Sequence, residues 1–184
     1  MVKPDKAVVL SDDTDVFVLL IHFLYTGDIT GQVYMQSTSH DPNTVIDINS
    51  TYEEHRDVAP NILAAHALSG CDTVGTYFGI GKSTVVKALK NSLSLDSIGN
   101  LKTSFHDSMR DATKFLLICY GQTKSNTLTD ARKRTWKSKV IRNNSVAPKL
   151  ESLPPTEEAF EENAGLWRNA LSENPPSINV LDFG

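Results

Sequence analysis

Short apolar runs at the start of the chain alternate with polar turns, and this pattern predicts a small α/β unit. Residues Ala7–Leu10 form a β-branched apolar run that is followed by polar residues. Such a run is typical of a strand buried on both faces, as in a parallel sheet. The longer apolar segment Val16–Tyr25 precedes Gly27 and predicts a helix that ends there. The candidate N-caps of this helix are Ser11, Asp12, Asp13 and Thr14.

The next two segments alternate apolar and polar residues, which is the pattern of short strands. They cover Gln32–Gln36 and Thr44–Ile48, and the turn-forming residues Asp41-Pro42-Asn43 lie between them. We therefore expect a hairpin in this part of the chain.

In the rest of the chain, apolar residues at three- and four-residue spacing and the positions of proline and glycine predict helices, one of which is a basic surface helix. The expected helices cover Asp57–Ser69, Ser83–Asn91, Thr103–Tyr120, Thr127–Val140 and Glu157–Leu171. In the third of these, the expected core stripe consists of Phe105, Met109, Ala112, Phe115, Leu116 and Cys119. Proline pairs flank the last helix, at Pro154-Pro155 and Pro175-Pro176.

The charges are unevenly distributed, although the net charge of the 184 residues is only −4. Residues 1–72 carry 11 acids and 3 bases, whereas residues 124–149 carry 8 bases and one acid. The basic segment is a candidate nucleic-acid-facing surface, and its Trp136 is a candidate for stacking on a base. A solvated basic face with Trp136 as a packed anchor is the alternative.

Two cysteines, Cys71 and Cys119, are too few for a disulfide framework or a structural zinc site. The longest apolar run is interrupted by His22 and falls short of the roughly 20 residues needed to span a bilayer. We therefore expect an intracellular protein without a membrane partner, and a nuclear location is compatible with this composition.

Three aspartates, Asp12, Asp13 and Asp15, fall within four residues after the first predicted strand. Like charges at this distance repel each other, and a divalent cation would remove that repulsion. Mg²⁺ prefers carboxylate oxygens, and the carboxyl ends of parallel strands are where α/β sheets place their sites. The alternative is that one aspartate caps the following helix while the others are solvated.

A second group of residues follows the predicted helix Asp57–Ser69. It begins with Gly70-Cys71-Asp72 and continues with Gly79-Ile80-Gly81-Lys82 before the next helix. Two glycines let a backbone approach a phosphate closely, and a helix N-terminus offers unpaired N–H groups. The sequence departs from a P-loop, because the glycine that this motif needs five residues before Gly81 is replaced by Thr76.

The acidic cluster, the Gly-x-Asp and the glycine turn occur in the order found in flap endonucleases, and residues 7–89 resemble this PIN-like nuclease superfamily. The likeness extends more loosely to transposon-derived proteins that contain the same Asp-Thr-Asp-Val and Ser-Gly-Cys-Asp-Thr motifs. It implies an α/β fold of partial PIN-like (Rossmann-like) type with a mostly parallel sheet. It also implies a helix-hairpin-helix-type element and a mainly helical C-terminal region. The expected domains are residues 1–122, a basic helical segment 123–147 and a proline-flanked tail 148–184.

The resemblance also implies roles for individual residues. Asp13, Asp15 and Asp72 would be the catalytic metal ligands, with Asp12 as a further acidic neighbour, and the ions would be Mg²⁺ or Mn²⁺, two in a complete domain. The nucleic-acid backbone, DNA in preference to RNA, would be gripped by Gly79, Ile80, Gly81, Lys82 and Lys87, with K⁺ as a candidate ion at the turn.

The family's active site also uses acids upstream of the cluster matched here, and the sequence does not supply them. Besides a globular fragment without independent activity, two hypotheses therefore stay open. One is a divalent-metal-dependent nuclease, structure-specific or 5′-acting, that cleaves phosphodiester bonds of DNA or RNA. The other is a catalytically inactive, nuclease-derived module that binds nucleic acid or protein.

Overall fold

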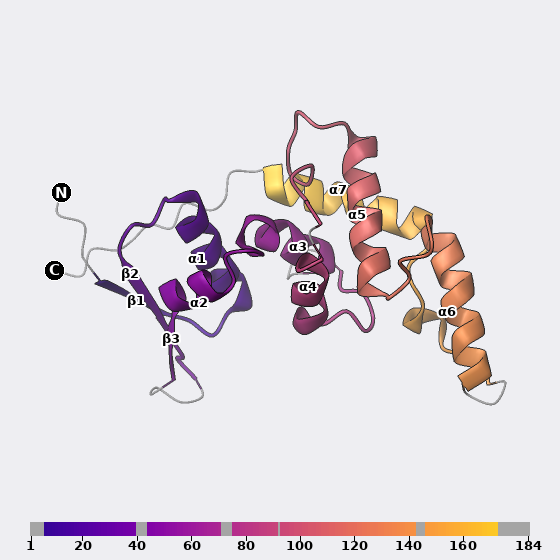
Figure 1. The fold of residues 1–184 in the computed structure, drawn as a ribbon, viewed down its shortest axis with the longest axis horizontal. Helices are drawn as coiled ribbons and strands as arrows, with labels where there is room; N and C mark the ends of the chain where they lie inside the picture. The colour runs from indigo at the N-terminus through magenta and orange to yellow at the C-terminus, as the bar shows by residue number, and fades with distance from the viewer. Residues whose placement is uncertain (1–5, 40–43, 71–74, 92, 143–145, 173–184) are drawn as a thin grey trace. The chain divides into compact units, whose positions relative to one another are not determined.

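The computed structural model describes residues 6–39, 44–70, 75–91, 93–142 and 146–172, with side chains up to residue 164 (Figure 1). Within these ranges the chain is an α/β protein with a three-stranded sheet and seven α-helices. The elements in chain order are β1 (Lys6–Leu10), α1 (Thr14–Thr26), β2 (Gln32–Gln36), β3 (Val45–Asp47), α2 (Ile48–Glu54), η1 (Ala59–Asn61), α3 (Ile62–Ser69), α4 (Lys82–Leu89), α5 (Phe105–Cys119), α6 (Leu128–Arg142), η2 (Leu150–Ser152) and α7 (Glu157–Ser172). Here η denotes a short 3₁₀ helix.

The chain divides into two compact units. Unit 1 consists of residues 1–66 and 82–93, and unit 2 consists of residues 67–81 and 94–184. The chain therefore leaves unit 1 within α3 and returns to it at the start of α4. The division expected from the sequence, with boundaries near residues 122 and 147, stays a prediction.

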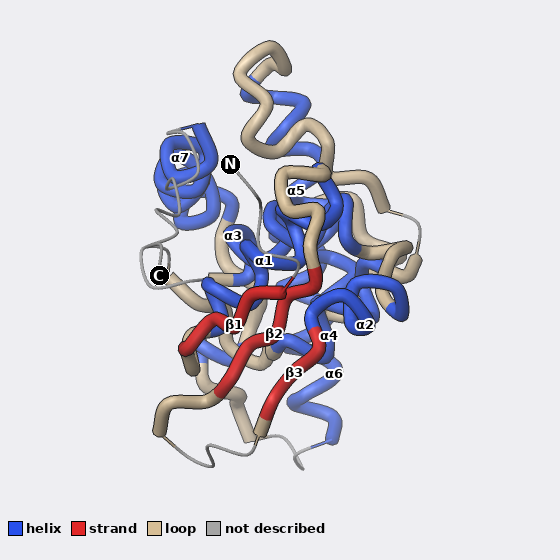
Figure 2. Tube along the Cα trace, turned by 90° about the vertical axis from the view of Figure 1, so that its left-hand side faces the viewer, coloured by secondary structure: helices blue, strands red, loops and turns tan. Residues whose placement is uncertain are grey.

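The sheet of unit 1 has the strand order β1-β2-β3, and Figure 2 shows the strands side by side in this order. β1 pairs with β2 in parallel, and β2 pairs with β3 antiparallel. The hairpin expected from the alternating segments is thus confirmed, while its predicted turn lies outside the described residues. The described sheet is mixed, so the expected predominance of parallel pairing is not seen within it.

In the described part of the chain, helices pack on one face of this sheet, and apolar side chains on the other face are exposed. Residues of α1, β2, α2 and η1 share one hydrophobic core, which contains Leu20, Ile21, Val33, Met35, Ile48 and Ala59, with Val9 of β1 against it. On the opposite face, Val8, Leu10 and Val45 are 57%, 65% and 52% exposed. The prediction of a first strand buried on both faces was therefore wrong, because β1 alternates between a core side and an exposed side.

The second strand of the hairpin is shorter than predicted, because Ile48 begins α2 instead of ending the strand. Asp47 is the N-cap of α2, and its carboxylate accepts hydrogen bonds from Ser50 N at 2.9 Å and from Gln32 Nε2 at 2.8 Å. In the first turn of α2, Asn49 Oδ1 accepts a hydrogen bond from Val33 N at 2.8 Å. Polar side chains at the start of α2 are therefore hydrogen-bonded to β2.

Unit 2 is helical in its described part. The predicted helices over Thr103–Tyr120, Thr127–Val140 and Glu157–Leu171 are present as α5, α6 and α7 with slightly shifted ends. Its fully buried side chains include Phe115, Leu116, Leu128 and Phe160. The predicted stripe on α5 is confirmed at Ala112, Phe115 and Leu116, but Phe105 at the first position of the helix is 43% exposed.

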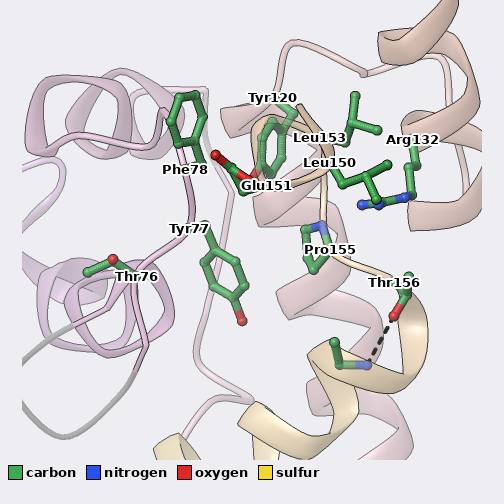
Figure 3. Close-up of a pocket in the computed structure, with 11 residues that line it drawn as sticks. Thr76, Tyr77, Phe78, Tyr120, Arg132, Leu150, Glu151, Leu153, Pro155 and Thr156 are labelled. Carbon is green, nitrogen blue, oxygen red and sulfur yellow. Dashed lines mark hydrogen bonds between the residues drawn. The ribbon is translucent and has the colours of Figure 1, made fainter. Parts of the chain in front are cut away.

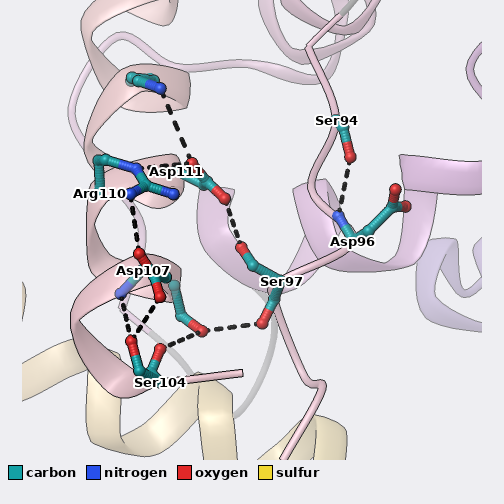
Figure 4. A network of polar contacts seen from close by, with 9 residues as sticks. Ser94, Asp96, Ser97, Ser104, Asp107, Arg110 and Asp111 are labelled. Atoms are coloured by element: carbon teal, nitrogen blue, oxygen red, sulfur yellow. Dashed lines mark hydrogen bonds and ion pairs between the residues drawn. The ribbon is translucent and has the colours of Figure 1, made fainter. Parts of the chain in front are cut away.

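A polar network fixes the start of α5 (Figure 4). Ser104 is the N-cap, with its hydroxyl accepting a hydrogen bond from Asp107 N at 3.1 Å. The buried Ser108 hydroxyl donates to the Ser97 carbonyl at 2.8 Å, and the Ser97 hydroxyl donates to Asp111 Oδ2 at 2.8 Å. These bonds attach the preceding irregular segment to the helix.

In the part of the chain that the structure describes, no helix is long and apolar enough to cross a bilayer.

Candidate functional site

The three clustered aspartates lie where the parallel pair β1 and β2 ends. β1 ends at Leu10 and α1 begins at Thr14, so Asp12 and Asp13 lie in the short connection and Asp15 in the first turn of the helix. The connection stays next to the end of β2, since Ser11 N donates to the Gln36 carbonyl at 3.0 Å. The predicted placement at the carboxyl ends of parallel strands is therefore confirmed for these residues.

Asp12 is engaged with the chain that follows β2. Its Oδ1 accepts a hydrogen bond from the Ser37 hydroxyl at 2.5 Å, and its Oδ2 accepts from Thr38 N at 3.0 Å and from the Thr38 hydroxyl at 2.5 Å. These bonds, that from Ser37 first, hold the pKa of the Asp12 carboxyl well below its usual range. Because both oxygens already accept hydrogen bonds, Asp12 suits a role in fastening the connection better than a role as a metal ligand.

Asp13 is the N-cap of α1, which confirms one of the candidate caps. Its Oδ1 accepts a hydrogen bond from Asp15 N at 2.8 Å. The other end of the helix is closed by Gly27, whose φ of 80° is left-handed and whose N–H donates to the Leu24 carbonyl. The cap holds the Asp13 carboxylate at the positive end of the helix dipole.

Asp15 is the first member of a hydrogen-bonded chain of three side chains in unit 1. His66 Nε2 of α3 lies 2.6 Å from Asp15 Oδ1, and Lys82 Nζ at the start of α4 lies 2.9 Å from His66 Nδ1. An ammonium group can only donate, so Nδ1 accepts and Nε2 carries the proton that is donated to Asp15. This pairing assigns His66 to the tautomer that holds the Asp15 carboxylate in place.

Burial differs along this chain. The side chain of His66 is only 8% exposed, whereas that of Asp15 is 37% exposed. His66 is thus a packed, hydrogen-bonded histidine. Sequence reasoning did not find that its partners are Asp15 and Lys82, because no local spacing connects residues that are 51 positions apart.

The glycine turn precedes α4, as predicted. Gly79 has φ of 80°, and Ile80 N donates to the Tyr77 carbonyl at 3.1 Å, which closes the turn. A Cβ built on Gly79 or Gly81 meets no described heavy atom within 4 Å, so the space beside both residues is open. The described structure bears on neither the K⁺ nor the phosphate expected at this turn, and both stay predictions.

The two predicted lysines of α4 have different surroundings. Lys87 is exposed, while the Lys82 amine is directed to His66. The Lys82 amine is therefore connected through His66 to Asp15, a contact that the predicted role in gripping nucleic acid did not include. The third predicted ligand, Asp72, lies outside the described residues.

The donor set can be tested for its fit to a divalent cation. Asp13 and Asp15 each use Oδ1 in an internal hydrogen bond, and among the described residues no hydrogen bond reaches their Oδ2 atoms. Mg²⁺ is often held by one or two carboxylates and completed by water and substrate phosphates, so these two residues fit such an ion. Among the described residues, no group of three or more His, Cys, Asp or Glu side chains is gathered around a metal position.

Comparison of the chain with protein-family models, with curated proteins and with solved structures gives no match. The family resemblance therefore remains a prediction from the sequence, and the geometry described above stands on its own.

Proposed function

We propose that this chain belongs to a divalent-metal-dependent nuclease of the flap-endonuclease-like (PIN-like) type, which cleaves phosphodiester bonds of DNA or RNA. The observation that supports the proposal is the pair Asp13 and Asp15 at the end of the parallel strands, with Asp15 held by a buried histidine. His66, the residue that holds Asp15, precedes Asp72 by six residues along the chain. The proposed ligands thus come from two separate segments of the sequence.

Each residue has a distinct part in the proposed chemistry. A bound Mg²⁺ or Mn²⁺ would polarise the phosphate and lower the pKa of a bound water. Asp13 and Asp15 would hold the ion, and His66 would orient Asp15 by donating its Nε2 proton to the carboxylate. Lys82 donates to the other side of the same ring and keeps the tautomer fixed.

Metal-dependent cleavage by the full chain tests this proposal. Flap and single-stranded DNA would be incubated with Mg²⁺ or Mn²⁺, and the wild type compared with Asp15→Asn and Asp72→Ala. Asp15→Asn keeps an oxygen that can accept from His66 but removes the charge that binds the ion. Asp57→Asn is the matched control, because this aspartate is exposed and lies outside the proposed ligand set. If the wild type cleaves and neither ligand variant is impaired, the assignment of the site is wrong.

A non-catalytic nucleic-acid or protein-interaction module is the second candidate. It is favoured by the internal hydrogen bonds, since Asp12, Asp13 and Asp15 each already have a partner within the chain. This candidate predicts salt-dependent binding of DNA without turnover in either metal. Cleavage that is lost in Asp15→Asn and kept in Asp57→Asn would eliminate it.

A further inference from the structure

Some basic side chains of helix α6 in unit 2 make contacts within the chain, and others are directed to solvent. Arg134 pairs with Asp130 at 2.8 Å, and Lys139 donates to the Ser152 carbonyl at 2.7 Å. Lys133 and Lys137 are exposed, and within the part of the chain that the structure describes no hydrogen bond or ion pair holds their amines, although the charge of Lys133 helps to lower the pKa of Asp130. These two lysines therefore offer charge to a partner outside the fold.

The same two lysines border an open hollow with an aromatic ring. The hollow has a volume of about 400 Å³, and it is lined by Arg132, Lys133, Trp136, Lys137, Leu150 and Leu153. Trp136 is 43% exposed and Leu150 is 68% exposed. The wall that faces solvent is apolar, because the aliphatic stems of the basic residues cover it together with the indole ring.

A second hollow adjoins the first, because Arg132, Leu150 and Leu153 line both. It has a volume of about 300 Å³, and Figure 3 shows Phe78 and Tyr120 among the residues that line it. Phe78, which directly precedes the glycine turn, is 59% exposed, and Lys139 Nζ lies 5.9 Å from the centre of its ring. The two hollows together present exposed aromatic rings beside several cations.

We propose that these adjoining hollows bind single-stranded nucleic acid, with one unpaired base stacked on Trp136 and another against Phe78. Lys133 and Lys137 would contact the phosphates between or beside these bases. Alternating aromatic and basic side chains are how proteins hold single strands without reading their sequence. A duplex hides the faces of its bases, so exposed rings set in hollows favour the unpaired strand.

The charges that face the hollows agree with this partner. Their lining includes three cations, Arg132, Lys133 and Lys137, against one carboxylate, Glu151, whose side chain lies 3.9 Å from Lys149 Nζ. An acidic peptide would satisfy the lysines, but it would gain little from the exposed indole of Trp136. The inference deepens the proposed function by naming the single strand as the substrate class, and it rests on that function only for its biological setting.

Binding of a labelled oligothymidylate of about 16 nucleotides to the full chain tests the inference. The measurement is made in EDTA, so that it does not depend on metal or on cleavage. In a Trp167→Phe background Trp136 is the remaining tryptophan, and its fluorescence should be quenched on binding. If the full chain binds the oligothymidylate but does not cleave DNA in the metal-dependent assay, the nuclease proposal is overturned and this inference stands.

Two variants and a matched control separate stacking from charge. Trp136→Ala should weaken binding by about 5- to 150-fold, whereas Trp136→Phe should retain most of it, since it keeps a ring. Lys133→Ala with Lys137→Ala should flatten the slope of log K against log salt by about 1.4. Lys102→Ala with Lys114→Ala should leave the slope and affinity unchanged, because these exposed lysines line neither hollow.

The outcomes that would overturn the inference are equally concrete. An unquenched Trp136, or equal affinity in Trp136→Ala, would show that no base stacks there. Equal binding of a labelled oligoglutamate would show that the surface is a site for acidic peptides. Circular dichroism of each variant separates a loss of binding from a loss of fold.

Discussion

Gly70, which follows α3, is the position at which one added methyl group should do the most damage. Its φ is 104°, and a Cβ built on it would lie 2.7 Å from both Cα and Cγ2 of Thr76. Carbon atoms in ordinary contact are about 3.5–4.0 Å apart. One of the two clashing atoms belongs to the backbone, so a change of side-chain rotamer cannot relieve the overlap.

The size of the effect follows from three contributions. The unfavourable backbone conformation costs an L-residue about 1–2 kcal/mol. Forcing extra volume into a filled space costs about 1–3 kcal/mol. Restriction of the unfolded chain offsets roughly 0.4–1 kcal/mol. Gly70→Ala should therefore lower the free energy of unfolding of unit 2 by roughly 2–4 kcal/mol.

Two neighbouring glycines serve as matched controls. Gly79 also has a positive φ, but a Cβ on it would meet no described atom within 4 Å, so Gly79→Ala should cost only about 1 kcal/mol. At Gly75 the space is also open and the conformation suits any residue, so Gly75→Ala should leave the stability unchanged or raise it slightly. The series separates backbone strain from the steric overlap.

Urea unfolding followed by tryptophan fluorescence measures the series. Both tryptophans, Trp136 and Trp167, belong to unit 2, as do the three glycines. The signal therefore reports the unit in which the changes are made, even if the two units unfold separately. Equal destabilisation by Gly70→Ala and Gly79→Ala would refute the close approach of Gly70 and Thr76.

Three further predictions concern charged and polar groups. His66→Ala should lower the free energy of unfolding of unit 1 by about 1–3 kcal/mol, because the hydrogen bond with Lys82 is lost. Water can replace this contact at Lys82, which limits the cost, and Lys82→Met should have a smaller effect than His66→Ala. Urea unfolding of both variants checks this order. Burial raises the pKa values of Tyr77 and Tyr120 to about 12, so both hydroxyls ionise more readily in the unfolded chain. The free energy of unfolding should therefore fall as the pH rises from about 10 towards 12, and it should fall less steeply in Tyr77→Phe. For Asp12 the pH dependence of stability has the opposite sign, because its pKa is lowered in the fold. Its contribution to the free energy of unfolding is present above the ordinary pKa of about 4 and is lost as the pH falls below that value. Asp12→Asn should therefore flatten the acid side of a stability–pH curve.

Local signals in the sequence predicted much of the secondary structure. The end of the helix after the first strand was predicted correctly because Gly27 is a specific C-cap, and Asp13 was one of four candidate N-caps. The hairpin followed from the alternation of Gln32–Gln36 and of the strand after it. In contrast, α2 was missed because it has only seven residues and shares Asp47 with the end of β3.

The arrangement in space was less predictable, because it depends on contacts between distant residues. A short run such as Ala7–Leu10 is apolar at every position, so its sequence does not show which face is covered. Likewise, the acidic cluster indicated Asp15 as a candidate ligand, but nothing near Asp15 or His66 in the sequence indicated that they meet. The roles of Asp12 and Asp13 as hydrogen-bond anchors became clear only when their partners were known.

The face of the sheet with exposed apolar side chains has a consequence for how the purified chain should behave in solution. Val8 and Leu10 of β1 are exposed on this face, as is Val45 of β3, and β1 and β3 are the two edge strands of the described sheet. An uncovered strand edge with apolar side chains is a template on which strands of other molecules can add. We therefore expect concentration-dependent aggregation to begin at β1, and a charged residue in place of Val8 should raise solubility without disturbing the core on the opposite face.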